Sequence, residues 1–238
     1  MACCGRCANE KLHSAEEEAS SIMLRTSQEL LRYGVEGRDG PLGSVDDFLV
    51  DDRSWAIRHI VVETGDFLSH HEVLIDPGAV DRLKFPEEML TISMSKQAVE
   101  ESPGIETSLP VSRQGEAGGA AGRLSESGVS LRSAKEIGTY QMHATDAVMG
   151  NVHGLIIDTS SWRVRYFVVD TGDFLDGRLV LLSPEAINKI DWPERRIYTG
   201  LSSEKVRHSP EYDGDAQLTR DYEAFLHFYY GWPHYWSD

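Results

Sequence analysis

The sequence predicts an all-β protein built from two tandem small antiparallel β-barrels, joined by a flexible linker and followed by a short aromatic C-terminal helix. Three observations predict this fold: the chain repeats itself, each copy consists of short strand-like runs separated by turns, and the intervening segment has the composition of a linker. The repeat has a fixed offset of 107 residues and no gap, so residues 24–103 (copy one) align with residues 131–210 (copy two). Of the eighty aligned pairs, 28 are identical.

Each copy contains strand-like runs at matching positions. They cover 43–50, 57–64, 73–75 and 89–92 in copy one, and 150–157, 164–171, 180–182 and 196–199 in copy two. An Asp-containing turn precedes the second run and ends in Trp55 or Trp162, which we interpret as turn-packing residues. A second turn at Gly65 and Gly172 is expected to need a positive φ. Five or six short strands in about 80 residues predict a small closed or nearly closed barrel.

The order of these elements resembles the PRC-barrel family. The residues that carry the resemblance are Gly43-x-Val45, the turn from Asp51 to Trp55, the strand from Arg58 to Val62, Val73-Leu74-Ile75-x-Pro77 and the return strand after Pro86, and copy two repeats this order. The family is named for the cytoplasmic domain of the photosynthetic reaction-centre H chain and includes the C-terminal domain of a ribosome-maturation factor. Because the family is functionally mixed, the resemblance implies an interaction or assembly module rather than a particular reaction.

The sequence is strongly acidic, with a formal net charge of −16 at pH 7. Copy one carries 8 basic and 16 acidic residues, copy two carries 10 of each, and residues 211–238 add a charge of −5. A surface this acidic repels nucleic-acid phosphates and anionic lipid, so we expect neither as a partner. It suits a basic protein partner, or it serves solubility alone.

The N-terminal segment is expected to lie outside the fold. No run of eighteen apolar residues occurs in the sequence, and the N-terminus lacks the apolar core of a secretion signal, so the expected location is the cytoplasm. The three cysteines, Cys3, Cys4 and Cys7, all lie in this polar segment, where the Cys4–Cys7 spacing is also that of half a zinc or redox site. We predict that residues 1–23 form a disordered extension, and the repeat starts directly after Met23, which makes Met23 a candidate translation start.

The segment between the copies, residues 104–130, is rich in Gly, Ala, Ser and Glu. We predict a flexible linker. Its 27 residues span about 30 Å as a coil, which lets the two copies pack side by side in any orientation.

Copy one carries a group of carboxylates that copy two mostly lacks. Asp46, Asp47, Asp51 and Asp52 lie in and before its first turn, whereas copy two keeps only Asp158. Divalent cations bind several carboxylates at once, so a metal site is one interpretation. Acidic residues that only stabilise the turn are the other, and we favour it.

The sequence contains no signature of catalysis. It has no Gly-x-Ser-x-Gly elbow, no phosphate-binding glycine loop and no His-Glu-x-x-His motif. The pair His70-His71 aligns with Gly177-Arg178, and neighbouring residues on a strand point to opposite faces, so we interpret the pair as a polar hairpin loop. We therefore expect a non-enzymatic protein without a cofactor.

The C-terminal tail holds nine aromatic residues among residues 211–238. Thr219 or Asp221 can cap a short helix that Gly231 and Pro233 end. The predicted apolar face of this helix holds Tyr222, Phe225, Leu226 and Tyr229. Because aromatic side chains are rarely left in water, we expect the tail to pack within the protein, in a homo-oligomer or on a partner. The candidate interaction residues are Tyr222, Phe225, Tyr229, Trp232 and Trp236.

Together these observations favour a non-enzymatic interaction or assembly module that forms a homodimer or binds another protein. The alternative is a small-molecule or metal sensor that uses the cleft between the two copies or the carboxylates from Asp46 to Asp52. An enzyme is the third possibility.

Overall fold

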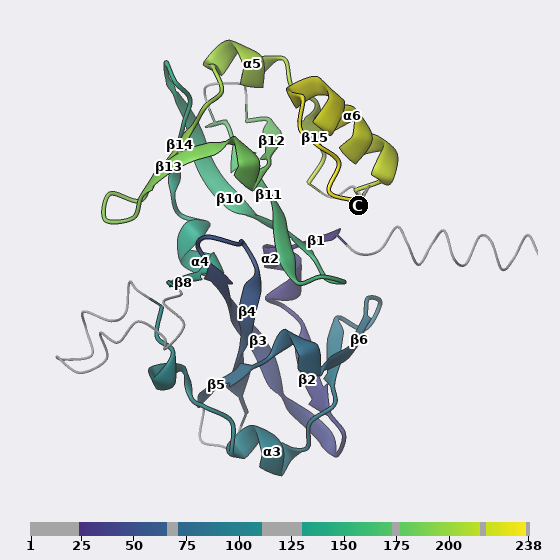
Figure 1. The fold of residues 1–238 in the computed structure, drawn as a ribbon. Helices are drawn as coiled ribbons and strands as arrows, with labels where there is room; N and C mark the ends of the chain where they lie inside the picture. The colour runs from purple at the N-terminus through teal and green to yellow at the C-terminus, as the bar shows by residue number, and fades with distance from the viewer. Residues whose placement is uncertain (1–23, 66–70, 111–129, 173–176, 215–217, 237–238) are drawn as a thin grey trace, which may run out of the picture.

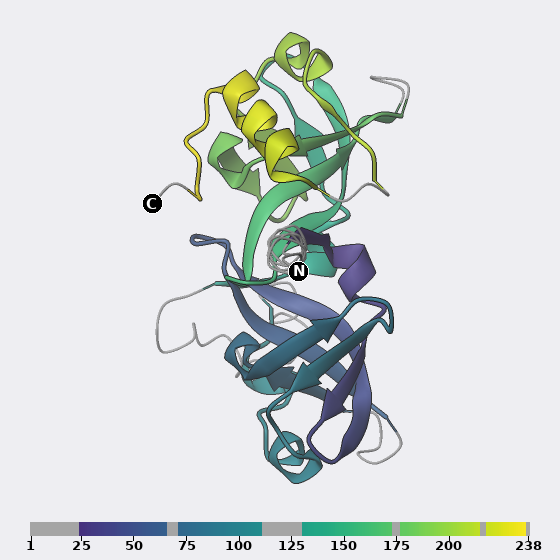
Figure 2. The ribbon, with the colours of Figure 1, turned by 90° about the vertical axis from the view of Figure 1, so that its right-hand side faces the viewer.

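The computed structural model describes residues 24–65, 71–110, 130–172, 177–214 and 218–236. These residues form a mostly β structure with two sheets, a few short helices and a C-terminal helix. Figure 1 shows a first half (residues 24–110) below a second half (residues 130–236), and Figure 2 shows the same arrangement from the side. The expected mostly β chain with two tandem units is confirmed at this level.

The first half is built on a seven-stranded sheet. Its own strands are β2 (Gly34–Gly37), β3 (Gly40–Asp51), β4 (Ile57–Thr64), β5 (Glu72–Ile75), β6 (Val80–Lys84) and β7 (Met89–Ile92). They lie in the order β5-β4-β3-β2-β7-β6. The short 3-10 helix η2 (Pro77–Ala79) connects β5 to β6, and α3 (Lys96–Glu100) follows β7.

The second half repeats this plan in an eight-stranded sheet. Its own strands are β9 (Gln141–His143), β10 (Val148–Asp158), β11 (Arg163–Asp170), β12 (Leu179–Leu182), β13 (Ile187–Asp191), β14 (Arg196–Thr199) and β15 (Glu211–Tyr212). They lie in the order β13-β14-β9-β10-β11-β12-β15. The connections are η6 (Pro184–Ala186) and α5 (Ser203–Arg207), and α6 (Arg220–Tyr230) follows β15.

Seven of the eight strand-like runs of the sequence lie wholly in strands and the run 164–171 passes the end of β11 by one residue, but two features of the predicted barrels need correction. The sheets are mixed, because β2 pairs parallel to β7 and β9 pairs parallel to β14. This parallel contact arises because the β6–β7 hairpin crosses to the far edge of the sheet and docks on β2. Among the described residues no pairing joins the two ends of either sheet, so the strand pairing closes no barrel.

The two halves exchange their first strands. Strand β1 (Leu24–Thr26) pairs with β10 of the second half, and β8 (Leu131–Ser133) pairs with β3 of the first half. The short helices that follow, α2 (Ser27–Leu30) and α4 (Ala134–Ile137), lie against the same strands. We call β1 with α2 the first arm and β8 with α4 the second arm. Figure 1 shows both arms at the middle of the molecule, where each half completes the sheet of the other.

The tryptophans of the first turns also cross the boundary. The N–H of Ile57 donates to the carbonyl oxygen of Trp162 (2.7 Å), and the N–H of Val164 donates to that of Trp55 (2.8 Å). Both tryptophans have a positive φ, 58° for Trp55 and 50° for Trp162, which costs free energy in a non-glycine residue and is held here by these hydrogen bonds. The predicted turn residues therefore stabilise the junction between the halves.

The rings of these tryptophans join the halves into one core. Trp55 packs edge-on against Phe167 of the second half with ring centroids 5.0 Å apart, and Trp162 contacts Phe48 of the first half at 6.4 Å. A single cluster of buried apolar side chains runs through both halves. The halves are thus not two barrels tethered only by a linker.

The second turn matches its prediction in one copy. Gly172 has a φ of +46°, whereas Gly65 does not adopt a left-handed conformation. Phe67 and Phe174, which follow these turns in the sequence, lie outside the described residues, as do His70 and residues 1–23 with their cysteines.

The outer faces of the two sheets are covered in different ways. On the second half, Ile156, Val168 and Leu181 lie under the C-terminal tail. On the first half the smaller cluster of Leu49, Val61 and Leu74 is covered by Leu131 and Ile105. Residues 104–110, the start of the predicted linker, therefore pack on β5 through the Val73–Gly104 bridge and the short helix η3 (Ile105–Thr107), and residues 111–129 lie outside the described part.

Candidate functional site

The C-terminal helix forms as the sequence predicts. Thr219 is its N-cap and accepts a hydrogen bond from the N–H of Tyr222 (3.2 Å). Gly231 ends it with a φ of 75°, the left-handed conformation that glycine adopts without strain. Leu226 is fully buried against the second sheet, so of the three expected modes of packing this part of the tail adopts the one within the protein.

The helix is rotated relative to the apolar face that the sequence predicts. Its buried side chains are Glu223, Leu226 and His227, whereas Phe225 is 58% exposed. The predicted face is therefore wrong at Phe225, because the buried side of the helix includes the polar side chains of Glu223 and His227. Both side chains instead find hydrogen-bond partners on the sheet, which compensates the loss of water.

A buried polar network fixes α6 to the sheet. The hydroxyl groups of Tyr166 (on β11) and Tyr235 lie 2.8 and 2.6 Å from Oε1 of Glu223. Nη1 of Arg220 donates to Oε2 of the same carboxyl (2.8 Å), and Nε2 of His227 lies 2.7 Å from the Tyr166 hydroxyl. Because each group is held by at least one other, this network replaces the hydrophobic contact that the sequence favours here.

The Tyr166 hydroxyl has one proton but two neighbouring groups, Glu223 and His227. If Glu223 is charged and His227 is neutral, both neighbours are acceptors and the network lacks one proton. Nδ1 of His227 faces the carbonyl oxygen of Pro233 (2.7 Å) and must donate to it, so Nε2 of a neutral ring accepts the only hydroxyl proton of Tyr166. The same hydroxyl lies within hydrogen-bond distance of Oε1 of Glu223, so one of the two groups, Glu223 or His227, carries a further proton. Burial raises the pKa of Glu223 and lowers the pKa of His227, and so disfavours the charged form of both groups.

The candidate interaction residues of the tail fall into two groups. Three of them contact the rest of the tail: Trp232 stacks on Tyr230 (4.2 Å), Trp236 stacks on His234 (4.7 Å), and the Tyr222 hydroxyl donates to the carbonyl oxygen of Glu211 (3.0 Å). The Tyr229 hydroxyl donates to the carbonyl oxygen of Lys205 in α5 (2.6 Å). Only Phe225 is exposed, so most of the predicted interaction residues pack within the chain.

The most exposed aromatic residue in the described part of the chain was not among these candidates. Phe228 is 84% exposed and lies one helical turn after Phe225. Its spacing of three residues from Phe225 was the available signal in the sequence. Asp221, Phe225 and Phe228 form what we call the outer face of α6. At the C-terminal end of the helix, Nζ of Lys205 donates to the carbonyl oxygen of Tyr229 (2.8 Å).

The carboxylates of copy one receive the second arm. Asp47 is buried and accepts hydrogen bonds from the hydroxyl of Ser133 and from the N–H of Lys135 (3.1 Å). Asp46 forms an ion pair with Nζ of Lys135. Burial raises the pKa of Asp47 above its ordinary value of 3.8, although its hydrogen bonds favour the charged form.

Of the other two carboxylates, Asp52 also binds the second arm, whereas Asp51 binds within its own turn and strand. Asp52 pairs with Nε of Arg132 on the second arm (3.1 Å). Asp51 pairs with Arg58 (2.8 Å) and accepts hydrogen bonds from Ser54, and these contacts lower its pKa to about 2 against the effect of burial. Within the described ranges, no group of three or more His, Cys, Asp or Glu side chains is arranged to hold a metal ion.

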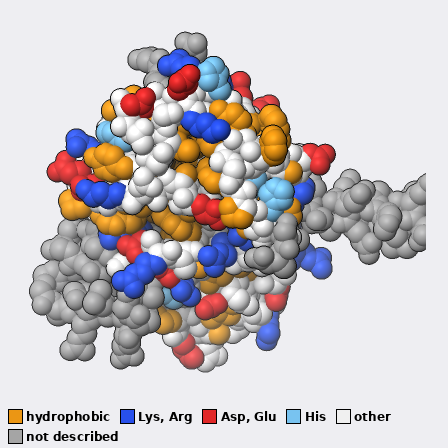
Figure 3. All heavy atoms as spheres, turned by 45° about the horizontal axis from the view of Figure 1, so that its top comes forward, with side chains coloured by type: hydrophobic (Ala, Val, Ile, Leu, Met, Phe, Trp, Pro, Cys, Tyr) orange, Lys and Arg blue, Asp and Glu red, His pale blue; other side chains and the backbone are white. Residues whose placement is uncertain are grey.

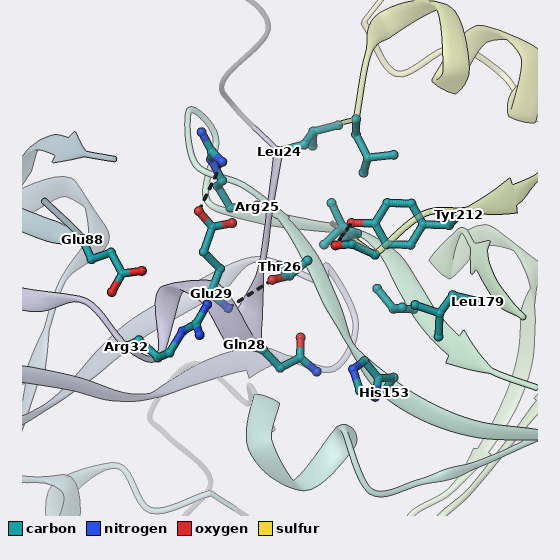
Figure 4. A pocket seen from close by; sticks show the side chains of 14 residues that line it. Leu24, Arg25, Thr26, Gln28, Glu29, Arg32, Glu88, His153, Leu179 and Tyr212 are labelled. Carbon is teal, nitrogen blue, oxygen red and sulfur yellow. Dashed lines mark hydrogen bonds and ion pairs between the residues drawn. The ribbon is translucent and has the colours of Figure 1, made fainter. Parts of the chain in front are cut away.

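A pocket opens beside the first arm, which we call the junction pocket (Figure 4). It has a volume of about 690 Å³ and is lined from both halves. Its polar side holds Arg25, Glu29, Arg32 and Glu88, and Arg25 pairs with Glu29 (3.2 Å). Its other side is the outer face of the second sheet, with Ile156, Val168, Leu179 and Tyr212, together with Leu218 from the segment before α6.

No protein-family model matches the chain, and no curated protein is similar to it. Among the described helices, none has the length and apolar character needed to cross a membrane.

Proposed function

We propose that the chain is a non-enzymatic interaction or assembly module of the PRC-barrel type, without a cofactor, that associates with a second copy of itself through the outer face of α6. The order of motifs in both copies and the two mostly β units support the resemblance to that family. The observation that carries the proposal is the exposure of Phe225 and Phe228, at 58% and 84%, on a helix whose opposite face is locked to the sheet.

The outer face of α6 is exceptional on the described surface. Besides Phe225 and Phe228, only Val148 is a large apolar side chain left exposed there. Two phenylalanines one turn apart form a contiguous apolar patch, which monomeric proteins seldom leave open without a use. Figure 3 shows hydrophobic side chains at the surface of the half that carries this helix.

The charges around the patch select a second copy as its occupant. Asp221 lies in the first turn of α6, and Lys205 lies at the last turn. Two such helices packed antiparallel about a two-fold axis bring Asp221 of each chain towards Lys205 of the other, and the phenylalanines meet at the centre. An 11-residue helix of about 16 Å can present all of these groups in one contact.

Sedimentation velocity over a range of concentrations tests this proposal. We expect the wild-type chain to shift from monomer to dimer as its concentration rises. Replacing both phenylalanines (F225S/F228S) should weaken the dimer at least tenfold, since burying a phenylalanine contributes about 2 kcal/mol. Val148→Ser is the matched control because it removes an exposed apolar side chain from β10.

Two outcomes contradict self-association. In one, the wild-type protein stays monomeric at all concentrations. In the other, the double variant dimerises as well as the wild type. Equal weakening by Val148→Ser also counts against the outer face of α6, since that residue lies on another element.

The junction pocket supports a second candidate function, the binding of a small molecule between the halves. Two arginines and two glutamates line it, so its formal charge is zero and it favours a neutral or zwitterionic molecule over an anion. The apolar side chains on its other side suit an apolar part of the same molecule.

Native mass spectrometry of the full chain, purified without denaturation, tests this second function. We expect a non-covalent adduct that is lost in Leu179→Trp, where the larger side chain fills the pocket. Val148→Trp is the control for an added indole outside the pocket. An adduct that persists in Leu179→Trp, or no adduct in the wild type, contradicts a ligand at this place.

A further inference from the structure

A second cleft lies at the boundary between the halves, beside the turns that end in Trp55 and Trp162. It has a volume of about 430 Å³ and shares no lining residue with the junction pocket. We call it the arginine cleft, because Arg53, Arg163 and Arg165 line it. These three arginines gather at one place, although the chain as a whole is acidic.

The three arginines differ in how they are paired. Arg165 is held by two hydrogen bonds to Asp158 (2.8 and 3.1 Å) and lies 3.8 Å above the ring of Tyr235. Arg163 donates from Nη2 to the carbonyl oxygen of Ser54 (2.6 Å). In the described part of the chain, neither Arg163 nor Arg53 has a carboxylate partner. Two guanidinium groups therefore keep donors available for an added anion.

The hydrogen bond of Arg163 fixes one of these groups in place. Its acceptor, Ser54, belongs to the turn of the first half, whereas Arg163 belongs to β11 of the second half. Arg53 is the neighbour of Ser54 in that turn. Because Arg163 reaches across the boundary to Ser54, the guanidinium groups of Arg53 and Arg163 line the same cleft. A guanidinium held by one hydrogen bond loses less conformational freedom when it binds a ligand.

The rest of the lining is mostly apolar or neutral. Trp55, Val164, Pro184 and Ile187 give the cleft an apolar wall, and Ser183 adds a hydroxyl group. Glu185 is the one acidic residue among the lining residues, and it is exposed. The charge of the lining is therefore positive, and the wall offers a ring face for a flat apolar group.

The corresponding place in the other half lacks these features. The 107-residue offset matches Arg53 with Ser160 and Arg163 with Ala56. It also matches Ser183 with Asp76, which brings a negative charge. The same fold thus forms without the two unpaired arginines, so the fold itself does not require them.

We propose that the arginine cleft binds a small organic anion, a molecule with one carboxylate or phosphate group on a flat apolar body. The oxyanion lies between the guanidinium groups of Arg53 and Arg163, and the apolar body lies against Trp55 and Ile187. The size of the cleft is within the range of small-molecule sites. This inference does not depend on either function proposed above.

The test is a titration of the full chain followed by the indole N–H signals in a two-dimensional nitrogen–proton NMR spectrum. The probes are phenyl phosphate, benzoate, inorganic phosphate and, as a neutral control, benzyl alcohol. We expect phenyl phosphate or benzoate to shift the Trp55 signal in a saturable way. The Trp162 signal is the internal control, since it lies at the matching place without the arginines.

Two substitutions give the cleft the residues found at the matching positions of the other half, Ser160 and Ala56. In the double variant R53S/R163A we expect binding to weaken at least tenfold, because both unpaired guanidinium groups are lost. Arg38→Ser removes one exposed arginine from the turn after β2 and should leave binding unchanged. The unaltered remainder of the spectrum shows whether each variant is folded.

The different probes of the titration distinguish the possible classes of ligand. Tighter binding of phenyl phosphate identifies a phosphate ligand, and tighter binding of benzoate identifies a carboxylate ligand. The proposal is overturned if neither compound shifts Trp55, if R53S/R163A binds as well as the wild type, or if inorganic phosphate alone binds as tightly as the organic anions. Sedimentation of the same double variant keeps this result separate from the proposed dimer, which it should not change.

Discussion

The two arms of the molecule make the same contacts with their own halves but meet different charges on the other half. In both, an arginine stacks over an aromatic ring at 3.9 Å: Arg25 over Phe85 and Arg132 over Trp192. In both, a buried tyrosine donates to the glutamate of the short helix, at 3.2 Å for the first arm and 3.1 Å for the second. All of these residues lie at matching positions of the two copies, so these contacts follow from the sequence repeat.

The difference lies in what the arms meet on the receiving sheet. The second arm meets Asp46, Asp47 and Asp52, whereas the offset places His153, Gly154 and Thr159 opposite the first arm. Nε of Arg132 is paired, but Nε of Arg25 is buried without a hydrogen-bond partner among the described residues. Three of the four carboxylates that suggested a metal site thus bind an arm of the same chain, and they account for part of the excess negative charge of copy one.

The largest expected effect is at Asp47. Asp47→Ala removes the acceptor for Ser133 and Lys135 in a buried place, and we expect a loss of about 3 kcal/mol in the free energy of unfolding. Asp47→Asn keeps an acceptor for the N–H groups of Phe48 and Lys135 and can donate to the Ser133 hydroxyl, so it should cost less than about 1 kcal/mol. Urea unfolding followed by circular dichroism measures both. Equal losses in the two variants would show that the hydrogen bonds to the second arm do not explain the role of Asp47.

The arginines of the two arms provide the next comparison. Arg132→Ala leaves Asp52 without its partner at a site where both side chains are 12% exposed, and we expect it to destabilise the fold by about 2 kcal/mol. Arg25→Ala also removes a buried N–H without a partner, so its cost should be lower by about 1 kcal/mol. Urea unfolding of the two variants measures both losses in the free energy of unfolding. A cost for Arg25→Ala equal to or above that of Arg132→Ala contradicts the difference between the arms.

A single substitution should make the first arm resemble the second. Thr159→Asp places a carboxylate at the position that matches Asp52, near the unpaired Nε of Arg25. We expect a gain of about 1 kcal/mol in stability in the wild type and no gain in an Arg25→Ala background. The difference between the two backgrounds measures the new pair directly. Equal effects in both backgrounds would mean that the added carboxylate does not reach Arg25.

The smallest expected effect is a dependence on pH that only one arm shows. Burial raises the pKa of Asp47 above 3.8, so the folded protein holds this proton to a higher pH than the unfolded chain. Wild-type stability should therefore fall relative to Asp47→Asn as the pH rises from below 3.8 through the raised pKa, and the difference should stay constant above it. Unfolding at a series of pH values measures this difference, and a rise of the wild type relative to Asp47→Asn has the wrong sign.

The sequence predicts the local structure well because the two copies constrain one another. The runs 57–64 and 89–92 coincide with β4 and β7, and the capping and ending of α6 follow from Thr219 and Gly231. The exchange of the arms has no comparable signal in the sequence. A strand has the same alternation of side chains whether it pairs with its own copy or with the other, so local pattern does not identify the partner.

The site was harder to predict for a related reason. Asp47 and Ser133 are 86 residues apart, so the carboxylates of copy one resemble an isolated acidic cluster until the second arm is placed beside them. Glu223 and His227 resemble surface residues until Tyr166 is placed under α6. In both cases the contact that decides the role of the residue is distant in sequence.

The most direct test of the exchanged arms is a set of cross-strand nuclear Overhauser effects, measured on the full chain at a concentration where it is monomeric. The structure predicts contacts of Arg25 with Ile157 and of Arg132 with Val50, since these are partners in the two strand pairings. If each arm instead lies on its own copy, the same experiment shows Arg25 with Val50 and Arg132 with Ile157. That result would contradict the exchange, and with it the role assigned to the carboxylates.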